Sequence, residues 1–240
     1  MPVPTNIAGT TLDAAKSGFW RSEKTPYLKK YTLSGRVHGM IANYLFFRLH
    51  TLRAECCNSV SGQGLINVAV SCVNLRVLSL AKCKQLFDQD LIEPLKVMTK
   101  IEDLDLSYTN ISGKCLNSLP SPGGNLKRLA MNCCPKLIDD SLFVILSRCH
   151  FLKYLDVSAT RIVGTALQKL VLTKLTQLHL DFCPKLSVEV ALALPLTTPN
   201  LRKLSVYGNW SNGFVYDLCE DLKKCIPNLK VSKFLVAYVS

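Results

Sequence analysis

Cysteine and histidine are the residues of this chain best suited to metal or nucleophilic chemistry. The 240 residues include 11 cysteines and four histidines. The cysteines come closest together in two adjacent pairs, Cys56-Cys57 and Cys133-Cys134. Zinc sites commonly space their ligands as Cys-x-x-Cys or His-x-x-x-His, and neither spacing occurs in this sequence. We therefore predict no metal site.

Acid–base catalysis has one candidate pair. His179 and Asp181 lie two residues apart, so on a strand they would share a face. No nucleophile is placed with them, and the sequence lacks the motifs G-x-x-x-x-G-K-[ST], G-x-S-x-G and H-E-x-x-H. We predict that the protein is not an enzyme, has no catalytic residues and needs no cofactor.

The charge balance suggests an acidic partner. Lysine and arginine number 29 against 17 aspartates and glutamates, which gives a formal net charge of +12 and invites a nucleic-acid hypothesis. Residues 1–48 hold seven bases against Asp13 and Glu23, a net charge of 7 − 2 = +5. The seven bases are Lys16, Arg21, Lys24, Lys29, Lys30, Arg36 and Arg48.

Membrane insertion and secretion are not expected. The sequence has no run of about 18 apolar residues that could span a bilayer. Residues 1–20 lack the apolar core of a secretion signal, and an odd number of cysteines suits a reducing compartment. We expect a cytoplasmic or nuclear protein. A mitochondrial location is a weaker alternative, because the first 20 residues contain only Lys16 against Asp13.

A repeat of about 26 residues must position any functional side chain. In seven aligned units position 4 is always leucine, position 6 is small or apolar, and position 9 is cysteine, threonine or asparagine. One unit cannot bury its own apolar face, so the units must stack. They begin at Leu49, Leu75, Ile101, Leu126, Leu152, Leu175 and Leu201, with a degenerate eighth at Leu229, and the successive spacings are 26, 26, 25, 26, 23, 26 and 28.

This pattern, L-x-x-L-x-L-x-x-N/C, identifies a leucine-rich repeat. The runs Cys134-Pro135-Lys136-Leu137 and Cys183-Pro184-Lys185-Leu186 resemble the cysteine-containing subclass, over roughly residues 49–230. That subclass includes F-box substrate receptors of ubiquitin ligases and antagonist-of-mitotic-exit-network proteins. The resemblance implies an α/β solenoid with a curved parallel sheet on the concave face and helices on the convex face.

The sequence lacks a clear site for the adaptor that links such receptors to a ubiquitin ligase. Residues 1–48 contain no Leu-Pro-x-Glu opening, so no F-box is recognisable. The run from Thr51 to Val60 resembles an elongin-binding box, but the same residues already form the first repeat. A link to a ubiquitin ligase would therefore need another adaptor.

We divide the chain into three parts. Residues 1–48 form a basic segment that includes a capping helix from Ser34 to about Arg48, because a solenoid must cover its first repeat. Residues 49–228 are the repeats, and 229–240 form a C-terminal cap. The insertion at 120–124 predicts an exposed loop, and the 23-residue unit from Leu152 predicts a shorter helix.

The helices of the repeats should begin in two ways. Asp88, Asp139 and Ser187 each place a side-chain oxygen near a helix start, where it interacts favourably with the helix dipole. Gly113 and Gly164 occupy the corresponding turns of the other units and predict a tighter turn.

The concave face is the expected binding surface. Positions 3, 5 and 7 of each repeat should point out of it, since side chains alternate along a strand. These three columns contain five acids and three bases, which argues against a phosphate-binding face. Aromatic side chains and arginine among mixed charges suit a protein partner. The predicted contact residues are Arg53, Asp103, Asp105, Tyr108, Arg128, Tyr154, Asp156, His179, Asp181, Phe182, Lys203 and Tyr207.

Two functions follow from these patterns. We predict a scaffold that binds a protein on its concave face, and the resemblance implies a substrate-recognition or adaptor role in a ubiquitin ligase. The alternative is an RNA-associated or ribonucleoprotein subunit that uses the basic N-terminal segment and a basic sheet edge. Position 2 supplies that edge with Arg76, Lys127, Lys153 and Arg202.

Overall fold

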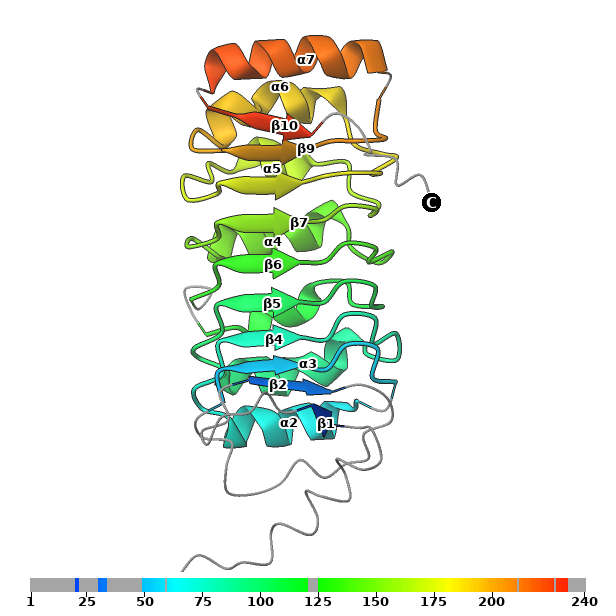
Figure 1. The fold of residues 1–240 in the computed structure, drawn as a ribbon, viewed down its shortest axis with the longest axis vertical. Coiled ribbons are helices and arrows are strands. Elements are labelled where there is room, and N and C mark those ends of the chain that lie inside the picture. Colours follow the sequence, from blue (N-terminus) through cyan, green and yellow to red (C-terminus); the bar gives the residue numbers. More distant parts are fainter. Residues whose placement is uncertain are drawn as a thin grey trace, which may run out of the picture.

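The structure is a computed structural model, and it describes residues 20–21, 30–33, 49–58, 60–120, 125–210, 212–226 and 228–232. These residues form a ten-stranded sheet in which the strands follow one another in chain order (Figure 1). Strand β1 is antiparallel to β2, and all later neighbours are parallel. Across these segments no helix is both long and apolar enough to cross a lipid bilayer.

The elements alternate strand and helix from β3 onward. The strands are β1 (Trp20–Arg21), β2 (Lys30–Leu33), β3 (Thr51–Arg53), β4 (Val77–Ser79), β5 (Asp103–Asp105), β6 (Arg128–Ala130), β7 (Tyr154–Asp156), β8 (Gln177–His179), β9 (Lys203–Ser205) and β10 (Lys230–Ser232). The helices are α2 (Gly62–Ser71), α3 (Asp88–Val97), the 3-10 helix η3 (Lys114–Ser118), α4 (Asp139–Arg148), α5 (Thr165–Lys169), α6 (Val188–Thr197) and α7 (Asn212–Cys225).

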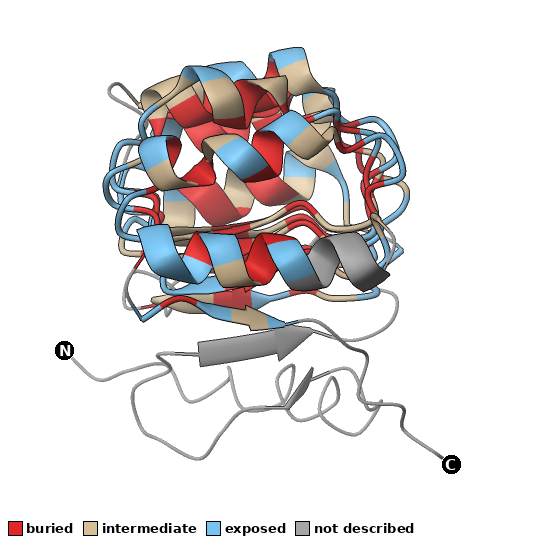
Figure 2. Cartoon of the chain, turned by 90° about the horizontal axis from the view of Figure 1, so that it is seen from above, coloured by how far each residue is buried: buried red, intermediate tan, exposed pale blue. Residues whose placement is uncertain are grey.

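This arrangement confirms the leucine-rich repeat solenoid. The helices pack on one face of the sheet, and the buried residues lie between the two layers (Figure 2). The central residue of each strand from β3 to β9 is the position-4 leucine, and it pairs in register with the same leucine of the next strand. All seven leucines are at most 3% exposed, so each strand buries one side chain in a continuous apolar column.

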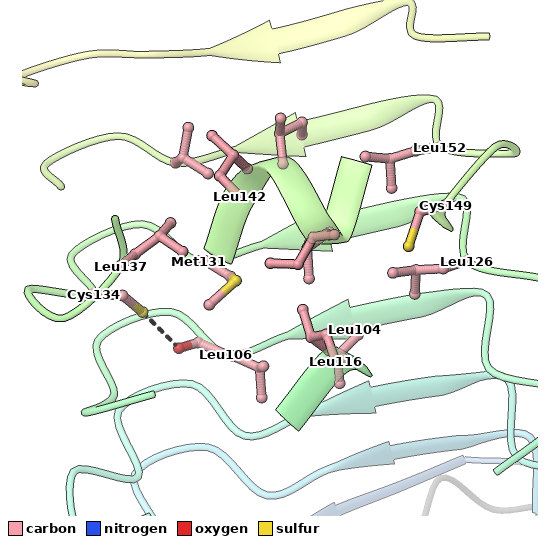
Figure 3. Packing of buried hydrophobic residues seen from close by; sticks show 14 of the residues in the cluster. Leu104, Leu106, Leu116, Leu126, Met131, Cys134, Leu137, Leu142, Cys149 and Leu152 are labelled. Atoms are coloured by element: carbon pink, nitrogen blue, oxygen red, sulfur yellow. Dashed lines mark hydrogen bonds between the residues drawn. The ribbon is translucent and has the colours of Figure 1, made fainter. Parts of the chain in front are cut away.

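Three of the cysteines at position 9, Cys83, Cys134 and Cys183, are hydrogen-bonded to the previous repeat. Cys83 Sγ donates to the Ala54 carbonyl at 3.0 Å, and Cys134 Sγ donates to the Leu106 carbonyl at 3.1 Å (Figure 3). In the last repeat the Asn209 amide donates to the Leu180 carbonyl at 2.7 Å. Burial raises the pKa of Cys83 to about 11, so this thiol stays protonated and keeps its donor hydrogen near neutral pH.

Every full repeat has the residue at one shared position in the left-handed backbone region. It is position 8, where φ lies between 53° and 73°. Here the amide bonds to the next repeat: Tyr108 N donates to Asn132 O at 2.8 Å, and Phe182 N donates to Tyr207 O at 2.7 Å. Hydrogen bonding between neighbouring repeats therefore continues into the turn after each strand. These bonds offset the roughly 1–2 kcal/mol that the left-handed conformation costs a residue other than glycine. The residues are Cys56, Lys82, Tyr108, Cys133, Ala159, Phe182 and Gly208.

Both predicted kinds of helix start are present, one in the long helices and one in the short helices. Helices α3 and α4 have ten residues each, whereas η3 and α5 have five. The short elements begin after Gly113 and Gly164, both at φ 94°. A Cβ atom at Gly164 would lie 2.4 Å from Val190 Cγ2, so this position requires glycine for its backbone and for space.

Aspartates at the long helix starts cap the short helix of the following repeat. Asp88 accepts hydrogen bonds from the amides of Ser112 and Cys115 at 2.9 and 3.0 Å. Asp139 does the same for Val163 and Gly164, at 2.6 and 2.7 Å. Burial alone would raise the pKa of Asp88, but these hydrogen bonds outweigh it and hold the pKa below its ordinary value.

Other predictions from the sequence concern the short helix, the two ends of the chain and one loop. The short helix α5 agrees with the 23-residue spacing, and β10 lies within the segment 229–240 that was predicted as a C-terminal cap, of which 233–240 lie outside the described residues. The capping helix expected from Ser34 to Arg48 and most of the loop at 120–124 lie outside the described residues. Strands β1 and β2 extend the sheet within the N-terminal segment, and no pattern in the sequence predicted them.

Replacing Asp88 by asparagine should lower the free energy of unfolding near neutral pH by about 1 kcal/mol, because the short helix loses its ionised cap. A carboxylate with a depressed folded-state pKa stabilises the fold above its unfolded pKa of about 3.9, and that contribution is lost as the pH falls through the folded pKa. The difference between wild type and Asp88→Asn should therefore shrink below pH about 4.

Urea unfolding at several pH values measures this difference. Asp140→Asn is the matched control, because Asp140 also lies in the first turn of a long helix but is exposed. A difference between wild type and Asp88→Asn that stayed constant down to pH about 2 would show that the carboxylate charge has no such role.

Candidate protein-binding face

The sheet face turned away from the helices carries the predicted contact residues. A row of four side chains crosses it on strands β5 to β8: Asp103, Arg128, Tyr154 and His179. Arg128 Nη1 lies 3.1 Å from Asp103 Oδ1. The guanidinium carbon of Arg128 lies 4.3 Å from the centre of the Tyr154 ring, and that ring centre lies 5.1 Å from the centre of His179. We call these four residues the central row.

The central row is held by charge and by partial burial. Burial opposes the charge of Arg128, but the nearby carboxylates, Asp103 first, outweigh it and raise the pKa of the guanidinium. Burial and the charge of Asp156 raise the pKa of the Tyr154 phenol, although Arg128 acts in the opposite sense. The row therefore presents a fixed cation between a carboxylate and a neutral aromatic ring.

A second group of aromatic residues lies at the sheet edge, where position 8 turns left-handed. The rings of Phe182 and Tyr207 meet edge to face with centres 5.1 Å apart, and Phe182 covers Gly208. Tyr108 lies under Lys82, whose Nζ is 5.6 Å from the ring centre. A hydrogen bond with Cys133 and the negative charge of its thiolate form raise the pKa of Tyr108.

Besides Asp103, which pairs with Arg128, the other three predicted acidic contacts accept hydrogen bonds from backbone amides. Asp105 Oδ1 accepts from the Ser107 amide at 2.9 Å, and Asp156 Oδ1 accepts from the Ser158 amide at 3.0 Å. Asp181 accepts from the Tyr207 amide at 2.7 Å, and both its oxygens accept from Ser205 Oγ, at 2.6 and 2.8 Å. These aspartates shape the turns after their strands as well as supplying charge.

The candidate acid–base pair is not assembled. Asp181 faces Ser205 and Tyr207, while His179 lies against the Tyr154 ring. Within the described ranges, no three histidine, cysteine or acidic side chains are arranged to hold a metal ion.

The remaining predicted contacts lie outside the central row. Arg53 is on β3 and pairs with Glu55 at 3.3 Å, and Lys203 is exposed on β9. Two small residues of the same columns, which were not predicted as contacts, are buried: Ser107 and Ala130 are 4% and 2% exposed. The Ser107 hydroxyl is buried and has no hydrogen-bond partner among the residues that the structure describes. The small size of Ser107 and Ala130, at repeat positions 7 and 5, could have predicted that their neighbours would cover them.

Comparisons with known proteins support the fold. No family model matches the chain. A similar solved structure is the complex of Rad7 and Elc1 from yeast, with a TM-score of 0.60, 22% identity and coverage of 78% of this chain and 48% of that one. Another is internalin C2 from Listeria monocytogenes, with a TM-score of 0.54, 19% identity and coverage of 85% and 80%.

The chain thus spans about half the length of the yeast chain that it matches. Both likenesses place this protein among leucine-rich repeat folds, in agreement with its parallel strands and alternating helices.

Replacing Arg128 by methionine should raise the pKa of Tyr154 further, because the cation that favours the phenolate is removed and the neighbouring carboxylates remain. NMR titration of protein labelled at the tyrosine ring carbons measures this change. Arg202→Met, at an exposed position on the sheet edge, should leave the Tyr154 titration unchanged. An unaltered Tyr154 pKa in Arg128→Met would contradict the arrangement of the central row.

Proposed function

We propose that this leucine-rich repeat protein is a non-enzymatic scaffold that binds a protein partner on its outer sheet face. The observation that carries the proposal is the central row, in which Arg128 is fixed between Asp103 and the Tyr154 ring. Arginine and tyrosine are enriched among the residues that dominate binding energy in protein interfaces. Because the row is ordered by its own contacts, a partner would lose little of its binding energy to ordering these side chains.

The charge of the face favours a polypeptide over a phosphate backbone. Asp103, Asp105 and Asp156 surround the single cation Arg128 on the four strands of the central row. A phosphate-rich ligand would meet net repulsion there, whereas a protein surface can offer lysine, arginine and hydrogen-bond donors. Tyr154 and His179 add apolar area beside these charges.

The finer proposal is a substrate-recognition or adaptor role in a ubiquitin ligase. It is supported by the resemblance of the Cys-Pro-Lys-Leu runs to F-box receptors and by the likeness to Rad7, which was solved in complex with Elc1. Leu52 is 3% exposed and pairs within the sheet, so the run from Thr51 to Val60 serves the first repeat. An adaptor would have to use other residues.

The RNA-associated alternative has less support from the sheet edge. Of its four bases at position 2, Arg76 and Lys127 both pair with Glu102. The pKa of that carboxyl is lowered by its hydrogen bond to Lys127, so it stays charged near neutral pH. The basic N-terminal segment lies largely outside the described residues.

Replacing Tyr154 by alanine should weaken the binding of a partner by at least about 2 kcal/mol, or roughly 30-fold in affinity. Affinity purification with mass spectrometry identifies proteins retained by the wild type, and calorimetry with each purified candidate measures the loss. Arg128→Ala should give a similar loss, since it removes the cation held by that ring.

Phe143→Ala is the matched control, because Phe143 is an exposed aromatic residue on helix α4, on the opposite side of the sheet. Partners that bind Tyr154→Ala and Arg128→Ala as well as wild type, but not Phe143→Ala, would place binding on the helix side and refute the proposal. Co-purification of a cullin adaptor tests the ligase role separately.

A further inference from the structure

The short repeat opens a notch on the edge of the solenoid where the strands begin. Helix α5 has five residues, whereas its neighbours α4 and α6 have ten. The segment that follows α5 lines a cavity of about 190 Å³ together with the end of α4 and the turn after it. We call this cavity the notch. Its lining includes Leu146, Cys149, His150, Leu170, Val171, Leu172, Thr173 and Lys174.

The notch is shaped for one apolar side chain. Five leucines contribute to its lining beside the polar residues Ser147, His150 and Thr173, and Val171 in the same lining is 66% exposed. Phe151, next to the lining residue His150, is 50% exposed. Pockets for drug-sized ligands usually exceed about 300 Å³, so a cavity of about 190 Å³ is too small for most metabolites. A leucine or phenylalanine side chain of a partner would cover the exposed valine without requiring a larger site.

The same edge carries cations without acidic neighbours. Backbone bonds join Thr176 N to Lys153 O, Arg202 N to Thr176 O, and Lys230 N to Arg202 O, at 2.8–2.9 Å, so these residues follow one another along consecutive strands. Adjacent strands are about 4.8 Å apart, which keeps the cations close together. Lys174, in the notch lining, adds another cation.

Within the part of the chain that the structure describes, these cations have no acidic partner. Among the described residues, no ion pair includes Lys153, Lys174, Arg202, Lys203 or Lys230. In the sequence, Asp156 is the only acid from residue 145 to 177, and none occurs from 190 to 216. At the other end of the same edge, Glu102 pairs with Arg76 and Lys127.

We propose that the notch and this edge bind an acidic peptide segment with one bulky apolar residue. The apolar side chain enters the notch, and the flanking aspartates or glutamates lie along Lys153, Lys174 and Arg202. This partner satisfies both features, whereas a nucleic acid would use the cations and leave the apolar notch uncovered. The inference goes beyond the proposed function, because the surface lies apart from the central row and needs none of its residues.

The test is selection of a displayed library of random 12-residue peptides on the full chain. We expect enriched peptides to contain leucine or phenylalanine flanked by acidic residues. A selected peptide, synthesised and labelled, should bind Val171→Asp at least about tenfold more weakly than wild type, and the same loss is expected for Lys153→Glu/Lys174→Glu. Salt should weaken wild-type binding.

Matched controls separate this edge from other surfaces. Val70→Asp changes a valine of similar exposure, 64%, on helix α2, and Lys84→Glu/Lys185→Glu reverses two exposed lysines in the loops at the opposite edge. Tyr154→Ala removes the central row. All three should bind the peptide as wild type does, so failure of this inference is distinguishable from failure of the proposed function. If Val171→Asp does not fold, Val171→Ser replaces it.

Three outcomes would overturn the inference. The enriched peptides could lack acids or a bulky apolar residue, or they could bind Val171→Asp with unchanged affinity. A twelve-nucleotide poly-uridine RNA could also bind wild type more tightly than any selected peptide and lose affinity only with the lysine reversals, which would assign the edge to nucleic acid.

Discussion

Each repeat of this solenoid forms backbone hydrogen bonds with the next repeat. The amides that follow the strands donate to carbonyl groups one repeat later, and Cys83, Cys134 and Cys183 donate to carbonyl groups one repeat earlier. Buried polar groups without partners are costly, so a single repeat removed from this stack would be unstable. The left-handed residue at position 8 is the consequence: without it the ladder of hydrogen bonds would end with the strand.

The contacts of each repeat with its neighbours explain how much of the fold could be predicted from the sequence. The apolar columns, the two helix entries and the short unit follow from spacing along the sequence, because each repeat makes its contacts at a fixed register. Leu104 and Leu129 align for this reason. Strands β1 and β2 could not be predicted, since Trp20 and Lys30 belong to no repeat and their pairing depends on contacts distant in sequence. The cross-repeat capping by Asp88 needed the structure, because its acceptor role depends on amides 24 and 27 residues away.

The candidate site was predictable in composition and less so in geometry. Arg128 and Tyr154 occupy the same column in adjacent repeats, so their contact follows from the register. His179 belongs to another column, and only its side-chain conformation brings it to the Tyr154 ring. Asp181 was predicted as a partner contact, a role that remains a prediction, and its hydrogen bonds to Ser205 and Tyr207 depend on a turn that spacing does not describe. The notch likewise arises from three residues missing in one repeat, whereas its volume depends on the surrounding packing.

The buried cysteines of the stacked repeats can report where the solenoid opens locally. Eight of the eleven thiols are buried, in places from the first repeat to α7, while Cys56 and Cys225 are exposed. Burial raises the pKa of Cys72 and of Cys149 to about 11, and alkylating reagents react with the thiolate. Each buried cysteine can therefore be modified only when its own part of the stack separates. The order in which they react would show where the solenoid begins to come apart.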